Sequence, residues 1–265
     1  MKLITFTVRD NSPRAGALID DGKNIVDLQS AHQSRGSAPS PHLANVLAIA
    51  EGGDEALALA KEAELQGKKA GTGVVLARAD VKLLAPIPHP PQMRDFLCFK
   101  QHIEQAFKAA RNLRAQRSPD PEAALREMEA KGILSVPVVS YERPISYHPN
   151  RLVVIGTDED VNWPAYSRVM DFELEFGCYI GKPGRNIPKE RAREHIFGYT
   201  IFNDLSARDE QTLEMPGQLG PGKGKNFDGA NVMGPCLVTA DEIGDPYRLT
   251  MIARVNGEEW GRGNS

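Results

Sequence analysis

The alternation of acidic and apolar residues between positions 171 and 176 constrains the fold of this chain more than any other feature. It predicts a β-strand that carries Asp171, Glu173 and Glu175 on one face. The strand continues into the apolar run 177–181, which is typical of a core strand. Buried carboxylates must be paired or must bind a cation, because burying an isolated charge is costly. A solvated strand face is the alternative for this segment taken alone.

A second strand adds another carboxylate. The apolar run over residues 199–203 predicts a buried strand, and Asp204 follows at its end, where catalytic ligands commonly lie. Alternatively, the pair at 203–204 opens a turn or caps a helix. If the chain continues as a helix, Arg208 and Gln211 share the face of Asp204. A set of ligands that are all oxygen atoms favours Mg²⁺, Ca²⁺ or Mn²⁺ over zinc.

The expected elements indicate two domains. Helical spacing over residues 42–65 is divided by Gly52-Gly53 into two helices that follow N-terminal strands. A cluster of prolines between residues 86 and 91 then predicts a stiff connector. We therefore predict a small N-terminal α/β domain over residues 1–85 and a catalytic domain over residues 86–265.

The second domain is predicted to be rich in β-structure, with a few helices. Helices are expected over 100–117, 121–131 and 188–197. Asn256-Gly257 predicts a two-residue hairpin turn. Short strands are expected over 96–99, 136–141, 152–155, 172–180, 199–203 and 249–255.

The charge balance limits the class of partner. The net charge is −3, from 32 basic and 35 acidic residues, and neither sign forms a long run. Nucleic acids and membrane surfaces usually need a concentrated basic face, so we expect a small-molecule partner, with no nucleic acid and no membrane. Three scattered cysteines predict neither a disulfide framework nor a CxxC zinc site, and they favour a reducing cytoplasm. No apolar stretch approaches the ~18–20 residues of a membrane span.

Further blocks of sequence occur in an order that is typical of one known family. They are Asp95-Phe96 with His102, Pro144–His148 with Val153–Thr157, Glu173-x-Glu175, Asn203–Gln211 and Gln218–Phe227. Together these blocks resemble the fumarylacetoacetate hydrolase family between about residue 92 and residue 260. The resemblance implies an α+β, β-rich fold, with a mixed β-roll or barrel-like catalytic domain.

The resemblance also implies a cation held by carboxylates and a reaction. Asp95, Glu173, Glu175 and Asp204 would hold the cation, with Mg²⁺ as the first choice and Mn²⁺ or Ca²⁺ as alternatives. His102 would be the general base that activates water. The expected reaction is hydrolysis of a carbon–carbon bond in a β-diketo acid or an acylpyruvate-like substrate, with an enolate as the leaving group. A homodimer is the expected assembly.

The remaining implied residues would bind the substrate. Arg111 and Tyr147 would contact its acid groups or carbonyls, and Arg208, Gln211 and Lys225 would stabilise the charge that develops on it. The sequence alone also allows structural roles for some of them. Arg111 belongs to a basic run that is typical of a solvated helix face, and Tyr147 could pack on a β-surface. His102 could be a partly exposed residue of a helix, without a catalytic role.

One departure from the family leaves other functions open. Family catalytic domains continue past the hairpin at Asn256-Gly257 with further strands and a carboxylate that orients the histidine, whereas this sequence stops at Ser265. We therefore expect the catalytic domain to be C-terminally incomplete. An isomerase, decarboxylase or hydratase of 2-oxo-dienoic acids could use the same metal site. A non-catalytic metal-binding protein is the alternative outside the enzymes.

Overall fold

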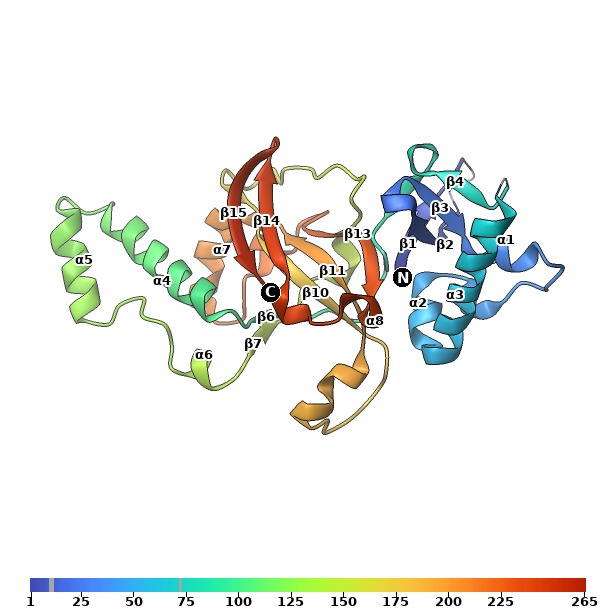
Figure 1. Cartoon of the computed structure of the whole chain (residues 1–265). Coiled ribbons are helices and arrows are strands. Elements are labelled where there is room, and N and C mark those ends of the chain that lie inside the picture. The colour runs from blue at the N-terminus through green and yellow to red at the C-terminus, as the bar shows by residue number, and fades with distance from the viewer. Residues whose placement is uncertain (10–11, 72) are drawn as a thin grey trace. The chain divides into compact units, whose positions relative to one another are not determined.

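The computed structural model describes residues 1–9, 12–71 and 73–265 (Figure 1). By its internal contacts the chain divides into two compact units. The first unit joins Met1–Gln92 to Asn150–Ser265, and the second unit is Met93–Pro149. The proline-rich connector belongs to the first unit, and the domain boundary expected near residue 85 stays a prediction.

A nine-stranded sheet forms the centre of the first unit. Two strands lie off its main path: β5 (Lys82–Leu84) pairs with β1, and β8 (Val154–Ile155) pairs in parallel with β13. The main path is open and, among the strands that the structure describes, does not close into a barrel; with the helices around it, the sheet confirms the predicted α+β, β-rich fold class. Its order is β10 (Leu174–Ile180), β11 (Ile196–Asp204), β13 (Asn231–Thr239), β1 (Lys2–Thr7), β2 (Arg14–Ile19), β3 (Asn24–Asp27) and β4 (Val75–Ala77).

Three helices cover the N-terminal strands of this sheet. They are α1 (Leu28–Gln33), α2 (Val46–Glu51) and α3 (Gly53–Ala70), so the break predicted at Gly52-Gly53 is confirmed. The side chain of Asn45 caps α2 by accepting a hydrogen bond from the Ala48 amide at 2.8 Å. Gly67 lets α3 approach the sheet, because a Cβ there would lie 2.3 Å from Cγ1 of Val26.

The C-terminal part of the first unit adds short elements. The hairpin turn at Asn256-Gly257 is confirmed, with φ angles of 52° and 86° at the two turn residues. The helix expected over 188–197 is a 3₁₀ helix, Lys189–His195, and not an α-helix. The other elements are β9 (Met170–Asp171), β12 (Ser206–Ala207), α7 (Arg208–Glu214), α8 (Ala240–Ile243), β14 (Thr250–Val255) and β15 (Glu258–Asn264).

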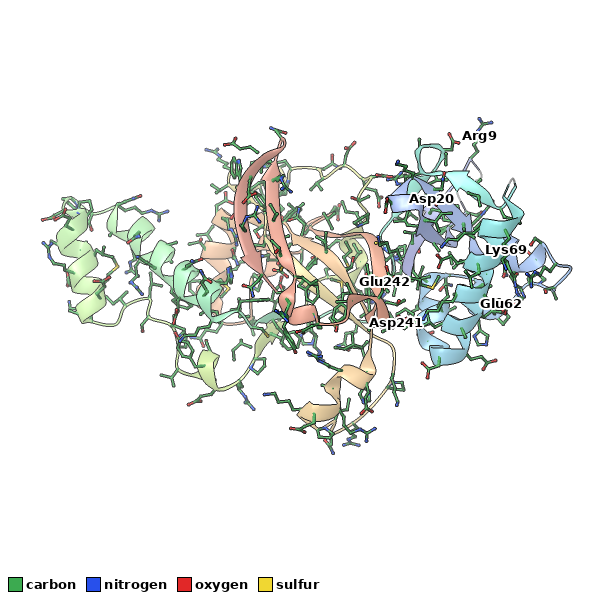
Figure 2. All side chains as sticks on the ribbon, viewed as in Figure 1. Arg9, Asp20, Glu62, Lys69, Asp241 and Glu242 are labelled. Carbon is green, nitrogen blue, oxygen red and sulfur yellow. The ribbon has the colours of Figure 1, made fainter. Side chains whose placement is uncertain are left out.

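Helix α8 is tied to the N-terminal helices by charge. Asp241, labelled in Figure 2, accepts a hydrogen bond from Nζ of Lys61 at 2.6 Å. Hydrogen bonds from Lys61 and from Thr239 lower the pKa of Asp241 to about 2. Of the helices that the structure describes, none combines the length and the apolar character needed to cross a membrane.

The second unit is mainly helical. Its helices α4 (Lys100–Ala115) and α5 (Pro121–Ala130) confirm the predicted pair. Asp120 caps α5 by accepting a hydrogen bond from the Ala123 amide at 3.0 Å, and Pro121 occupies the first turn. The strand expected over 136–141 is wrong, because a short helix α6 (Val139–Glu142) forms there. A two-stranded sheet completes the unit, with β6 (Asp95–Leu97) antiparallel to β7 (Ile145–Tyr147).

Candidate active site

Backbone pairing between β10 and β11 gathers three of the predicted ligands. Leu174 lies opposite Asn203 in the antiparallel register, and the Asp204 amide donates to the Glu173 carbonyl at 3.2 Å. Carboxylate oxygens of Glu175 and Asp204 lie within 4.8 Å of each other. Asp204 is fully buried. The end of this strand pair therefore concentrates negative charge where water has little access.

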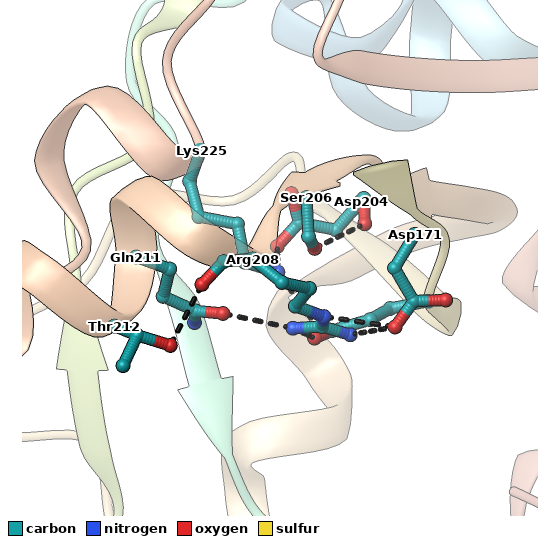
Figure 3. A network of polar contacts seen from close by, with 8 residues as sticks. Asp171, Asp204, Ser206, Arg208, Gln211, Thr212 and Lys225 are labelled. Carbon is teal, nitrogen blue, oxygen red and sulfur yellow. Dashed lines mark hydrogen bonds and ion pairs between the residues drawn. The ribbon is translucent and has the colours of Figure 1, made fainter. Parts of the chain in front are cut away.

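Two cationic side chains offset that charge. Nζ of Lys225 lies 2.6 Å from Oδ2 of Asp204 and 3.1 Å from Oε2 of Glu173, and Lys225 is only 2% exposed. On the other side of Glu173, Nη1 of Arg208 donates to Oε1 at 2.5 Å and to Oε1 of Gln211 at 2.9 Å (Figure 3). Burial raises the pKa of Glu173, but the charges of Lys225 and Arg208 outweigh burial and lower this pKa to about 2.

A glycine allows Lys225 to reach this position. The 3₁₀ turn Gly222–Gly224 precedes Lys225 and packs against α7. A Cβ at Gly224 would lie 2.7 Å from the backbone of Gln211, which is closer than real side chains approach. A side chain at residue 224 would therefore push the lysine-bearing segment away from the helix that carries Arg208 and Gln211.

The donor set of the first unit fits a hard divalent cation. Glu173, Glu175 and Asp204 offer only carboxylate oxygens, the ligand type that Mg²⁺, Mn²⁺ and Ca²⁺ prefer. The spacing between Glu175 and Asp204 lets both carboxylates reach one ion. Lys225 and Arg208 limit the net negative charge, so an acidic ligand is tolerated beside the cation.

The second unit carries the other four predicted site residues. Asp95 lies on β6 directly opposite Tyr147 on β7, so the short sheet presents the two residues together. His102 and Arg111 lie on α4, nine residues apart. Nη1 of Arg111 donates to the Leu134 carbonyl at 2.8 Å. The side chain of His102 is exposed and, within the described ranges, makes no hydrogen bond or ion pair.

Sequence reasoning missed one residue of the network, Asp171. Its Oδ2 accepts a hydrogen bond from Nε of Arg208 at 2.8 Å and forms an ion pair with Nη2 at 2.8 Å. The alternation predicted one strand that carries Asp171 and Glu173 on the same face, but β9 ends at Asp171 and β10 begins only at Leu174. The condition under which Arg208 and Gln211 would share a helix face with Asp204 is not met, because β12 separates them and α7 begins only at Arg208.

Comparison with known proteins shows which family and which proteins this chain resembles. The family model for the fumarylacetoacetate (FAA) hydrolase C-terminal domain matches residues 93–265. Over 261 residues the chain is 31% identical to the mitochondrial oxaloacetate tautomerase fahd2 of Xenopus laevis, covering 97% of this chain and 68% of that protein. Over 247 residues it is 32% identical to the oxaloacetate tautomerase YisK of Bacillus subtilis, covering 92% of this chain and 71% of that protein.

A solved structure supports the fold. The maleylpyruvate hydrolase of Sphingobium sp. SYK-6, in complex with manganese(II) and pyruvate, superimposes with a TM-score of 0.63 at 21% identity, covering all of this chain and 76% of that one. At this level of identity the likeness concerns the fold alone. The family model covers well over half of the chain, and the site offers the carboxylates that a metal-dependent enzyme needs. The chain therefore belongs to the fumarylacetoacetate hydrolase family of metal-dependent enzymes.

Proposed function

We propose that this protein catalyses the keto–enol tautomerisation of a small 2-oxo acid of the oxaloacetate type, with the help of one divalent cation. The observation that carries the proposal is the pair of carboxylates of Glu175 and Asp204, within 4.8 Å of each other and beside the buried ammonium group of Lys225. Such a site can hold a cation and an anionic substrate together. The two relatives at 31% and 32% identity are both named oxaloacetate tautomerases, which supports this substrate class.

The proposed ligands of the cation are Glu175 and Asp204, together with Glu173 from the same unit and Asp95 from the second unit. When bound, a divalent cation would act as a Lewis acid that polarises the 2-oxo group of the substrate. The manganese(II) and pyruvate in the maleylpyruvate hydrolase complex support a cation and a 2-oxo acid as partners. Mg²⁺ stays the first expectation, with Mn²⁺ and Ca²⁺ as alternatives.

The side chains divide the proton transfer between them. The imidazole of His102 removes a proton from carbon 3 of the substrate, and the electron pair of that C–H bond becomes the C2–C3 double bond. The ammonium group of Lys225 has three N–H donors. Two of them face Asp204 and Glu173, and the third donates to the oxygen on which negative charge develops. Water protonates that oxygen to give the enol, and His102 releases to water the proton that it took from carbon 3, so the number of protons is unchanged.

The substrate's outer groups would be held by side chains of the second unit. Arg111 and Tyr147 are proposed to bind the far carboxylate. A fixed position for this carboxylate brings carbon 3 within reach of His102, and holding the reacting groups together lowers the barrier. In this proposal Gln211 supports Arg208 beside the carboxylates, because its Oε1 accepts from Nη1 of Arg208 at 2.9 Å.

Hydrolysis of a carbon–carbon bond is the second candidate. It uses the same residues, except that His102 removes a proton from water, and the resulting hydroxide attacks the carbonyl that will leave as a carboxylate. The leaving fragment departs as an enolate, so Lys225 has the same task. The order of sequence blocks between residues 92 and 260 supports this candidate.

The test follows the ultraviolet absorbance of enol oxaloacetate as it relaxes to the keto form. We expect the wild type to accelerate the exchange well above buffer that contains the same metal. EDTA should abolish the acceleration, and added Mg²⁺ or Mn²⁺ should restore it. The Glu175→Gln variant should be inactive, and Glu210→Gln, which removes a charge outside the network, should match the wild type. A rate equal to that of metal-containing buffer would rule out tautomerisation.

A panel of acylpyruvates and β-diketo acids separates the other functions. Two carboxylic products identify a hydrolase, and carbon dioxide identifies a decarboxylase. Cation binding without turnover on any substrate identifies a non-catalytic metal-binding protein. The homodimer implied by the family resemblance stays a prediction, which light scattering after size-exclusion chromatography tests.

A further inference from the structure

Asp171 holds one edge of the Arg208 guanidinium group. It lies on β9, directly opposite Ser206 of β12, and α7 begins two residues later at Arg208. Nε and Nη2 of Arg208 both lie 2.8 Å from Oδ2 of Asp171 (Figure 3). The Arg208 amide also donates to the Val169 carbonyl at 2.8 Å, so the backbone and the side chain of this residue are both fixed to the β9 segment.

The other edge of the guanidinium group points at Glu173. Nη1 donates to Oε1 of Glu173 at 2.5 Å and to Oε1 of Gln211 at 2.9 Å. Together with the hydrogen bond from Nε to Asp171, these bonds use three of the five N–H groups of Arg208, and Nη2 is in addition 2.8 Å from Oδ2 of Asp171. Because most of its N–H donors contact side chains of the protein itself, the guanidinium group has few donors left to bind a substrate.

The contacts continue from Glu173 to the reacting region. Oε2 of Glu173 lies 3.1 Å from Nζ of Lys225, which in turn lies 2.6 Å from Oδ2 of Asp204. Glu173 therefore has one oxygen on Arg208 and the other on Lys225. Its carboxylate cannot rotate without breaking one of these contacts, so Glu173 links the position of Arg208 to that of Lys225, which Asp204 also holds.

We propose that Asp171 is a positioning residue, which fixes Arg208 against Glu173 and thereby holds Lys225 in place for the reaction. This inference rests on the proposed function of the site. Arg208 acts through Glu173 and does not contact the substrate. The side chain of Asp171 is 46% exposed, so its replacement by Asn removes the charge without opening the core.

The test measures kcat and KM for oxaloacetate in Asp171→Asn, alone and combined with Arg208→Met. Loss of a residue that orients a catalytic group typically costs 10–100-fold, so we expect kcat to fall by about tenfold with little change in KM. In the Arg208→Met background, Asp171→Asn should have no further effect. Glu210→Gln, in the first turn of α7, is the charge-matched control and should behave as the wild type.

Two results would overturn the positioning role. One is an increase in KM at unchanged kcat, which a direct contact between Arg208 and the substrate predicts. The other is an equal loss of kcat with and without Arg208. Urea midpoints of the four variants show whether any loss reflects unfolding.

A measurement without turnover keeps the two proposals apart. The affinity for Mn²⁺ alone, measured by calorimetry, should fall by about tenfold in Asp171→Asn because Glu173 is no longer held, and it should be unchanged in Glu210→Gln. If the wild type turns over no 2-oxo acid while this difference holds, the tautomerase proposal fails and the positioning role stands. If Asp171→Asn binds Mn²⁺ as tightly as Glu210→Gln does, the positioning role is wrong.

Discussion

The two units carry site residues in opposite physical settings. In the first unit, Glu173, Asp204 and Lys225 are mostly or fully buried, and each contacts another charged side chain. In the second unit, His102 stands exposed on α4, and Arg111 is held by the Leu134 carbonyl. The charged network is fixed by strand pairing and ion pairs, whereas the helix residues are placed mainly by the backbone of α4.

Because of this difference, substitutions in the two units should affect stability and activity to different degrees. Buried charges depend strongly on their partners, because removing one partner leaves the other desolvated and unpaired. An exposed side chain can be replaced at almost no cost to folding. Variants in the first unit should therefore change both stability and activity, and variants on the exposed face of α4 should change activity alone.

The largest expected effect is on activity, in His102→Ala. Loss of a general base typically costs about 10²–10⁴-fold, so we expect kcat for oxaloacetate to fall by that factor. The free energy of unfolding should change by no more than ~0.5 kcal/mol, since the side chain is exposed and makes no polar contact with the residues described. Stopped-flow absorbance and urea unfolding measure the two quantities. Wild-type activity in this variant would remove His102 from the mechanism.

The next effect is on stability, in Lys225→Met. Glu173 and Asp204 then lose a shared ammonium partner in a buried setting. Breaking a buried pair typically destabilises a protein by about 3–5 kcal/mol, and we expect a loss of that order in urea unfolding with EDTA present. Added Mg²⁺ should recover part of it, because a cation would again neutralise the carboxylates. A variant as stable as the wild type would show that the network does not support the fold.

The smallest of the three effects is a pH dependence that arises from Glu173. Its pKa of about 2 lies below the ordinary value of 4.5, so it stabilises the fold fully above pH 4.5. That contribution, about 3 kcal/mol at most, is lost as the pH falls from 4.5 towards 2. Urea unfolding between pH 7 and pH 3 should therefore depend less on pH in Glu173→Gln than in the wild type. Parallel curves for the two proteins would contradict the shift.

The strand pattern predicted the charged network because alternation along a strand determines which side chains share a face. Period-two alternation placed Glu173 and Glu175 on one face, and the end of an apolar run placed Asp204 at a strand terminus; the pairing of β10 with β11 then brought them together. The link between Asp171 and Arg208 was not predictable in this way. It depends on β9 pairing with β12, two-residue strands that have no sequence signal of their own.

The wrong secondary-structure predictions share a physical cause. Residues 136–141 are rich in valine, yet β-propensity reflects packing against neighbouring strands, and this segment is largely exposed. Residues 189–195 are mostly charged, and only His195 among them is buried, so no apolar stripe stabilises an α-helix there. The open path of the sheet also has no signature in the sequence, because closure depends on which strands meet at its ends.

The pairing of β1 with β13 has a consequence for how the chain folds during synthesis. Lys2 lies opposite Val238, and Leu3 lies opposite Leu237. During synthesis β1 is therefore made more than two hundred residues before its partner β13, and contacts of such long range slow folding. Until then β5 covers this edge of β1 only over Thr5–Thr7, which leaves Lys2 and Leu3 without a strand beside them, and exposed strand edges invite aggregation. Expression at low temperature or with chaperones should favour the native pairing.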